Sequence, residues 1–112
     1  MAYNKYGNKK VKVDSHTFDS QKEARRYKEL KLMERAGVIK DLELQPAFEL
    51  IPTIRTETET LRKTVYKADF RYLDTNTGGV VVEDVKGFRT QVYKLKKKML
   101  LDKYKDIDFR EV

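Results

Sequence analysis

The most restrictive feature of this 112-residue sequence is a pair of alternating segments, residues 64–73 and 80–86, joined by a short turn. In both segments the side chains alternate between two faces, which is the period of a β-strand. The intervening residues 74–79, DTNTGG, include Asn and Gly, which adopt positive φ readily. The second segment should therefore fold back antiparallel to the first, and the sequence predicts a β-hairpin around which the rest of the chain is organised.

Three charged side chains are expected close together on this hairpin: Asp69, Asp84 and Lys86. Asp84 and Lys86 are two positions apart, so they point the same way, about 7 Å apart along the strand. Acidic residues are depleted in strands and adjacent carboxylates repel, so packing alone does not explain this arrangement. The core face of the first strand is expected to carry Tyr66, Ala68, Phe70 and Tyr72.

Two interpretations of these charges remain open from the residues alone. A divalent cation would relieve the repulsion, because Mg²⁺ prefers oxygen ligands such as Asp69, Asp84 and the backbone carbonyl of Val85. Lys86 would then hold or help deprotonate an attacking water, and the site would hydrolyse a phosphodiester. The other interpretation is a hairpin end with an ion pair between Lys86 and one of the two aspartates, which contributes little at a surface.

The charge of the chain favours a polyanionic partner. Twenty-five Lys and Arg residues against eighteen Asp and Glu residues give a net charge of +7. Such a field concentrates nucleic acid near the protein, although many small basic proteins have no such partner. The chain has no Cys and a single His, so a disulfide framework is excluded and zinc sites are disfavoured. Any metal must be held by oxygen.

The length suits one domain with one core, so we expect residues 1–112 to form a single domain, with residues 1–10 as a flexible basic arm. No apolar run approaches the roughly 20 residues that span a bilayer, and the N-terminus does not resemble a secretory signal. We expect a cytoplasmic protein without a membrane. Residues 10–14 and 16–18 suit short strands, and His16 is expected to be a surface residue rather than a catalytic base.

A helix is predicted over residues 21–36, where Pro and Gly are absent. Ser20 and Glu23 have the spacing of a capping box, and Gly37 suits the left-handed position that ends a helix. Glu23 therefore has two candidate roles. It caps its own helix, or its carboxylate reaches toward a metal.

A strand is predicted over residues 42–51, but Pro46 cannot donate to a ladder and should interrupt or bulge it. The polar residues 53–63 are expected to form an exposed loop or a protruding hairpin. A second helix is predicted over residues 88–104, followed by a final strand in residues 106–112.

This second helix should bury Val92, Leu95 and Met99 and expose a basic face. That face carries Arg89, Gln91, Lys94, Lys97 and Lys98. A run of charges is usually a solvated surface, but this one directly follows Lys86. We therefore expect these five residues to contact nucleic acid, with Gln91 and Lys94 placed best to contact phosphates.

The order of these motifs resembles the PD-(D/E)XK nuclease superfamily. Asp69 is followed about fifteen residues later by Asp84-Val85-Lys86, with a helix bearing Glu23 before them and a basic helix after them. Nearly all of residues 15–112 resemble a small family of uncharacterised phage-encoded proteins usually placed in that superfamily. The segments that carry this resemblance are DSQKEARRYKEL, AGVIKDLELQPAFEL, YKADFRYLD and VVEDVKG. One departure is Ala68, which stands where the family name has Pro.

The resemblance implies an α/β, restriction-endonuclease-like fold with an αβββαβ core and a mixed sheet flanked by two helices. Asp69 and Asp84 would be ligands of Mg²⁺ or Mn²⁺, Lys86 would be the catalytic lysine, and Glu23 would add a carboxylate to the metal site. The expected activity is endonucleolytic hydrolysis of DNA. The relatives of similar size imply a homodimer that cuts branched DNA like a Holliday-junction resolvase, in the cytoplasm of a bacterial host carrying a phage or prophage.

Two other functions stay open. The first is a non-catalytic, basic DNA- or RNA-binding accessory protein of phage recombination or replication, in which the acidic residues serve structure. Metal binding separates it from the nuclease, because both bind phosphates in a salt-sensitive way. The second is an assembly component of a phage particle, which would bind a protein partner and not nucleic acid.

Overall fold

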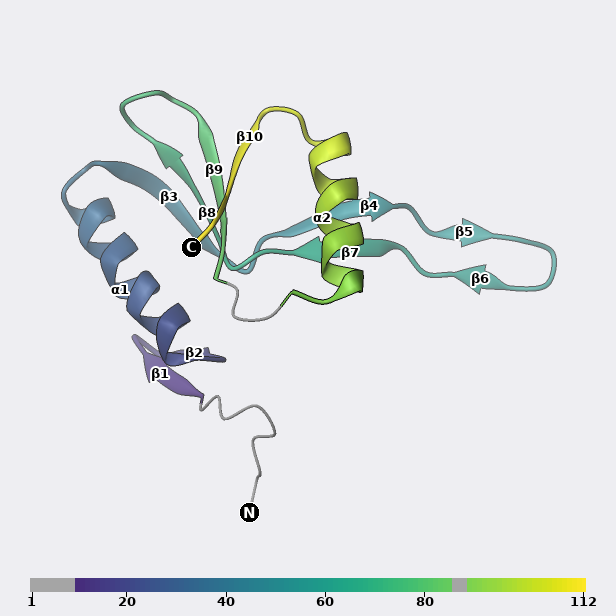
Figure 1. Ribbon diagram of the computed structural model, residues 1–112, viewed down its shortest axis with the longest axis horizontal. Coiled ribbons are helices and arrows are strands. Elements are labelled where there is room, and N and C mark those ends of the chain that lie inside the picture. The colour runs from purple at the N-terminus through teal and green to yellow at the C-terminus, as the bar shows by residue number, and fades with distance from the viewer. Residues whose placement is uncertain (1–9, 86–88) are drawn as a thin grey trace, which may run out of the picture.

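The computed structural model describes residues 10–85 and 89–112, and these ranges contain two helices placed on opposite faces of a mixed sheet (Figure 1). The helices are α1, Gln21–Arg35, and α2, Gln91–Lys103. The sheet has the order β10-β9-β8-β3. Its strands are Ile107–Glu111, Val80–Asp84, Phe70–Asp74 and Ile39–Leu44, respectively. Strand β10 is parallel to β9 and the other pairs are antiparallel, so the α/β class is confirmed.

Each helix covers its own hydrophobic core. On the α1 side, Leu30 packs with Phe70 and Val81; on the α2 side, Leu100 packs with Val82. All of these side chains are at most 2% exposed. Within the described ranges neither helix is long and apolar enough to cross a membrane.

The segment expected as one strand over residues 64–73 is divided at Ala68–Asp69 into β7, Thr64–Lys67, and β8. All four expected core residues are buried, but the division splits them between the two cores: Tyr66 and Ala68 join the α2 side, and Phe70 and Tyr72 join the α1 side. The facing strand is interrupted at the same level, between β3 and β4, Ala47–Ile51. The expectation of one continuous strand with a single core face is therefore wrong.

The two facing strands are interrupted side by side, at Gln45–Pro46 and at Ala68–Asp69, and we call this place the bend. It coincides with Pro46, where the sequence predicts an interruption because proline has no N–H. Two hydrogen bonds keep the facing strands paired through it, from Gln45 N to Asp69 O (2.9 Å) and from Ala68 N to Pro46 O (3.0 Å). Gln45 has a φ of 50°, in the left-handed region that residues other than Gly rarely adopt. The chain therefore turns sharply beside Asp69.

Beyond the bend, β4 and β7 leave the sheet as a paired arm. The outer end of this arm is a second antiparallel pair, β5, Ile54–Arg55, and β6, Thr60–Leu61. Of the two structures expected for residues 53–63, the protruding hairpin is the one observed. Figure 1 shows that this end extends well past α2.

The elements around α1 form as the sequence predicts. Strands β1, Val11–Val13, and β2, His16–Phe18, make an antiparallel hairpin. Ser20 caps α1, because its Oγ accepts a hydrogen bond from Glu23 N at 3.1 Å. Gly37, with a φ of 80°, follows the end of the helix.

The buried face predicted for α2 is wrong in two of its three residues. Val92 is 63% exposed and Leu95 is 59% exposed, whereas Leu100 is fully buried. Met99 is partly buried against the same core as Tyr93, as expected. Apolar residues lie on two neighbouring faces of this helix, and the face containing Tyr93 and Leu100 packs on β4 and β7.

An ion pair between a partly buried arginine and a fully buried glutamate joins α1 to β9. Arg26 donates two hydrogen bonds of 2.7 Å to the two carboxylate oxygens of Glu83, which is fully buried. The hydroxyl of Tyr72 also donates to Glu83. The hydrogen bond to Glu83 raises the pKa of Arg26, and burial, followed by the same carboxylate, raises the pKa of Tyr72. Breaking such a pair leaves one charge buried without its counterion.

Arg26→Met is therefore expected to lower the free energy of unfolding by about 3 kcal/mol or more, because Glu83 stays buried. Urea denaturation followed by circular dichroism measures this change. Arg25→Met, at an exposed position of α1, is the matched control and should change stability by less than about 0.5 kcal/mol. Equal stability of the two variants would contradict the importance of the buried pair.

Candidate functional site

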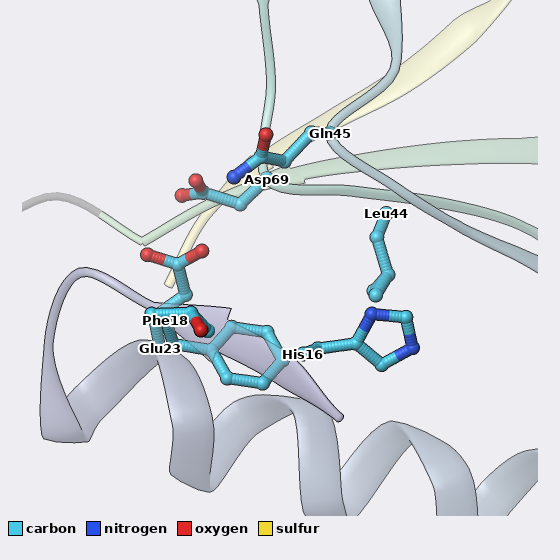
Figure 2. Close-up of a pocket in the computed structure, with 7 residues that line it drawn as sticks. His16, Phe18, Glu23, Leu44, Gln45 and Asp69 are labelled. Atoms are coloured by element: carbon cyan, nitrogen blue, oxygen red, sulfur yellow. The ribbon is translucent and has the colours of Figure 1, made fainter. Parts of the chain in front are cut away.

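A cavity of about 190 Å³ lies between the start of α1, strand β2 and the bend. Glu23, Asp69 and Gln45 line it, and Figure 2 shows the carboxylates of Glu23 and Asp69 pointing toward one another. The other walls are His16, Thr17, Phe18 and Leu44. Two of the acidic residues singled out in the sequence are thus brought together from different elements.

Local structure places both acidic residues and orients the carboxylate of Asp69. Glu23 is in the first turn of α1, where the helix dipole favours a negative charge, and it is only 6% exposed. Asp69 donates its N–H to Glu83 O at 3.1 Å, and its Oδ2 accepts the N–H of Val85 at 2.7 Å. These two bonds tie Asp69 to the end of β9.

Asp84 is fully buried, and Tyr66 donates its hydroxyl to Asp84 Oδ2. Among the described residues, the walls of the cavity do not include Asp84. Asp84 is nevertheless linked to Asp69, because the N–H that Asp69 accepts belongs to Val85, the residue that follows Asp84. The predicted catalytic residue Lys86 lies outside the described residues.

The donors at the cavity suit a hard cation in part. Carboxylate oxygens from Glu23 and Asp69 and the amide oxygen of Gln45 are the ligand type that Mg²⁺ prefers, and Mg²⁺ usually keeps several waters. However, residues 10–85 and 89–112 contain no group of three or more His, Asp or Glu side chains arranged to hold a metal. The cavity thus brings two carboxylates together, and the ligand roles of Glu23, Asp69, Asp84 and the Val85 carbonyl all stay predictions.

Two of the five predicted nucleic-acid contacts, Arg89 just before α2 and Lys97 within it, are engaged by Glu111 of β10. Arg89 Nε and Lys97 Nζ each lie 2.9 Å from a carboxylate oxygen of Glu111, and the Tyr93 hydroxyl donates to it at 2.5 Å. The hydrogen bond from Tyr93, followed by those from Arg89 and Lys97, lowers the pKa of Glu111 to about 2. Glu111 thus offsets part of the positive charge on this side of α2.

The remaining three predicted contacts, Gln91, Lys94 and Lys98, are exposed. A hollow of about 460 Å³ follows this side of α2 and is lined by Arg89, Tyr93, Lys94, Lys97, Lys98 and Leu101. Four of the five predicted residues therefore gather on one surface. Gln91, the first residue of α2, does not line this hollow.

Sequence reasoning missed His16 and Gln45 as residues of the cavity. His16 is exposed, as expected, yet it also lines the cavity shared by the two acids. Gln45 precedes Pro46, so a break in the strand was visible in the sequence, but its positive φ was not. Both positions depend on how the β2 hairpin and the bend pack together.

Comparison with known proteins identifies a family of unknown function. Residues 3–112 match the family described as "Protein of unknown function (DUF1064)", and the chain therefore belongs to that family. A search of curated proteins and a search of solved structures each found no match.

The depressed pKa of Glu111 predicts a pH-dependent contribution to stability. Because the pKa falls from its ordinary value of 4.5 to about 2, the ionised carboxylate stabilises the fold above pH 4.5, and this contribution is lost as the pH falls toward 2. Glu111→Gln should lower stability at neutral pH by about 1 kcal/mol or less, since the group is partly exposed. Thermal unfolding should show that the difference in stability between this variant and the unmodified protein narrows between roughly pH 5 and pH 2.

Asp106→Asn, in the exposed turn before β10, controls for the loss of one surface carboxylate. If the difference in stability between Glu111→Gln and the unmodified protein stayed constant with pH, this would contradict the lowered pKa of Glu111.

Proposed function

We propose that this member of the DUF1064 family is an endonuclease that hydrolyses DNA phosphodiester bonds with Mg²⁺ or Mn²⁺. The observation that carries the proposal is the meeting of Glu23 and Asp69 across one cavity. Carboxylate oxygens are the ligands that a divalent cation such as Mg²⁺ prefers, and two of them beside one cavity offer it two such ligands. Carboxylate-held metals of this kind are common in sites that act on phosphates.

The order of elements supports a restriction-endonuclease-like core. Along the chain, α1 is followed by β3, β8, β9, α2 and β10, and these are the two helices and the four strands of the mixed sheet. This order agrees with αβββαβ if the arm of β4 to β7 is treated as an extension of the β3–β8 hairpin. We therefore retain the PD-(D/E)XK superfamily as part of the proposal.

In the proposed site, Glu23 and Asp69 hold the cation, with Asp84 and the Val85 carbonyl as further ligands. The bound metal would supply Lewis-acid stabilisation of charge at the phosphate and a more acidic water. Val85 orients Asp69 through its N–H, and Tyr66 orients Asp84 through its hydroxyl. Lys86 is proposed to hold the attacking water and assist its deprotonation.

One observation favours the non-catalytic alternative. Asp84 is completely buried against Tyr66 and is held there by a hydrogen bond, as a structural carboxylate would be. In that case α2 binds DNA or RNA and no cation binds at the cavity. Calorimetric titration with Mn²⁺ separates the two functions. Heat of binding that disappears in Asp69→Asn favours the nuclease, and no binding even with DNA present favours the accessory protein.

Branched DNA and a homodimer complete the proposal, in the cytoplasm of a bacterial host carrying a phage or prophage. They rest on the resemblance to small resolvases, and on a basic α2 that presents Lys94 and Lys98 to solvent. Comparison of cleavage of four-way junctions with cleavage of linear duplexes tests the substrate. Equal rates on both would remove the branched-DNA part and leave the nuclease intact.

Glu23→Gln, Asp69→Asn, Asp84→Asn and Lys86→Ala are each expected to reduce DNA cleavage by roughly 100-fold or more, since charge stabilisation by a bound metal is worth several kcal/mol. The measurement is a cleavage assay with Mg²⁺ or Mn²⁺ on single-stranded, duplex, flapped and four-way DNA. DNA affinity should be largely retained in all four variants.

The matched control for these variants is Asp106→Asn, which removes a carboxylate far along the chain from the site and should cut at the unmodified rate. Thermal unfolding of each variant shows whether it is folded. Undiminished cleavage by folded Asp69→Asn or Lys86→Ala protein would refute the proposed site.

Lys94→Gln and Lys98→Gln should each weaken DNA binding and reduce its salt dependence, because each lost phosphate contact lowers the log–log salt slope by about 0.9. Fluorescence anisotropy at several salt concentrations measures both effects. Lys28→Gln, an exposed lysine on α1, is the control and should leave the slope unchanged. Identical slopes for all three variants would show that the hollow on α2 does not contact DNA.

A further inference from the structure

The outer end of the arm is a surface that lacks support within its own chain. Strands β5 and β6 pair only over Ile54 with Leu61 and Arg55 with Thr60. Ile54 is 44% exposed and Leu61 is 47% exposed, so the cross-strand apolar pair faces water. An isolated two-stranded ribbon is at best marginally stable in water. A partner that covers Ile54 and Leu61 would stabilise this end.

The turn at the end of the arm is acidic in a protein with a net charge of +7. Glu57 and Glu59 both lie in this turn and are exposed, and neither makes an ion pair within the described residues. Arg55 and Arg62 lie on either side of the turn, so the negative charge is confined to its tip. The tip of the arm thus presents two carboxylates beside an exposed apolar pair.

A groove with the opposite charge lies between β7 and the start of α2. It has a volume of about 320 Å³, and its walls include Val65, Lys67, Val92 and Lys96. Neither lysine makes an ion pair with an acidic side chain in residues 10–85 and 89–112. Val92, one of the two residues predicted to be buried but found exposed, lies in this groove. The groove therefore combines apolar surface with two positive charges.

The tip and the groove of one chain cannot meet, because β5 and β6 extend away from α2 (Figure 1). A second copy of the chain can supply the missing half. In a two-fold symmetric dimer, the tip of each copy would enter the groove of the other, so that both contacts form at once. The lysine-lined hollow proposed for DNA is on the side of α2 that faces Glu111, and its lining includes neither Val92 nor Lys96.

We propose that the protein forms a two-fold dimer in which Ile54, Leu61, Glu57 and Glu59 of each arm dock against Val92, Lys67 and Lys96 of the other copy. This inference deepens the homodimer of the proposed function and rests on it. It names the surfaces that associate, and it does not require that the cavity of Glu23 and Asp69 be catalytic. The contact combines burial of apolar side chains with pairing of opposite charges, which gives specificity as well as affinity.

A charge exchange between tip and groove tests the proposal. The tip variant carries Glu57→Lys and Glu59→Lys, and the groove variant carries Lys67→Glu and Lys96→Glu. Each alone places like charges in both contacts of the dimer, so sedimentation equilibrium should report the 13.3 kDa monomer. An equimolar mixture of the two should recover the dimer, because both contacts of the mixed pair then join opposite charges. The protein with all four changes should also dimerise.

Lys28→Glu with Lys40→Glu controls for the change in net charge, since both lysines are exposed and lie on α1 and β3. This control should stay dimeric. A monomeric unmodified protein, or tip and groove variants that remain dimeric, would overturn the proposal. A tip variant that binds DNA more tightly without any change in mass would assign the groove to nucleic acid instead and would also overturn it.

Mass is measured without substrate, so this result is separate from the cleavage assay. A dimer that does not cut DNA would refute the nuclease and keep the interface. A monomer that cuts DNA would refute the interface and keep the nuclease.

Discussion

The ion pair between Arg26 and the buried carboxylate of Glu83 sets the position of α1 relative to β9, and the geometry of the candidate site depends on it. Arg26 lies about one turn after Glu23, and Glu83 directly precedes Asp84. A guanidinium that donates to both oxygens of one carboxylate leaves little freedom for either element to rotate or slide. Because removing water from two charges costs free energy, we interpret the pair as a device that selects one arrangement of helix and strand more than as a source of stability.

Most of the element boundaries could be predicted because their causes lie within a few neighbouring residues. The hydroxyl of Ser20 meets the N–H of Glu23 and starts α1, and Gly37 adopts the positive φ that follows its end. Pro46 interrupts its strand because it has no N–H to donate. The turn at residues 74–79 reverses the chain into an antiparallel neighbour. Each of these signals involves residues close together along the chain, so the boundaries could be predicted from the sequence.

Features that depend on packing between distant elements could not be predicted in this way. Helix α2 has apolar residues on two faces, and contact with β4 and β7 decides that Leu100 is buried and Leu95 is not. The change of sheet face at Ala68 is set by the bend, and it places Tyr66 where its hydroxyl reaches Asp84. The sequence predicted Glu23 and Asp69 as partners through a resemblance, whereas their convergence on one cavity with Gln45 and His16 required the three-dimensional arrangement.

The bend connects the arm directly to the acidic cavity. Two peptide hydrogen bonds, between Gln45 and Asp69 and between Ala68 and Pro46, join the arm to the sheet at the point where Asp69 faces Glu23. A tilt of the arm that displaced Asp69 would change the separation of the two carboxylates. A partner that bound the arm and favoured such a displacement would alter affinity at the cavity, and by thermodynamic reciprocity a ligand in the cavity would then alter affinity at the arm by the same factor.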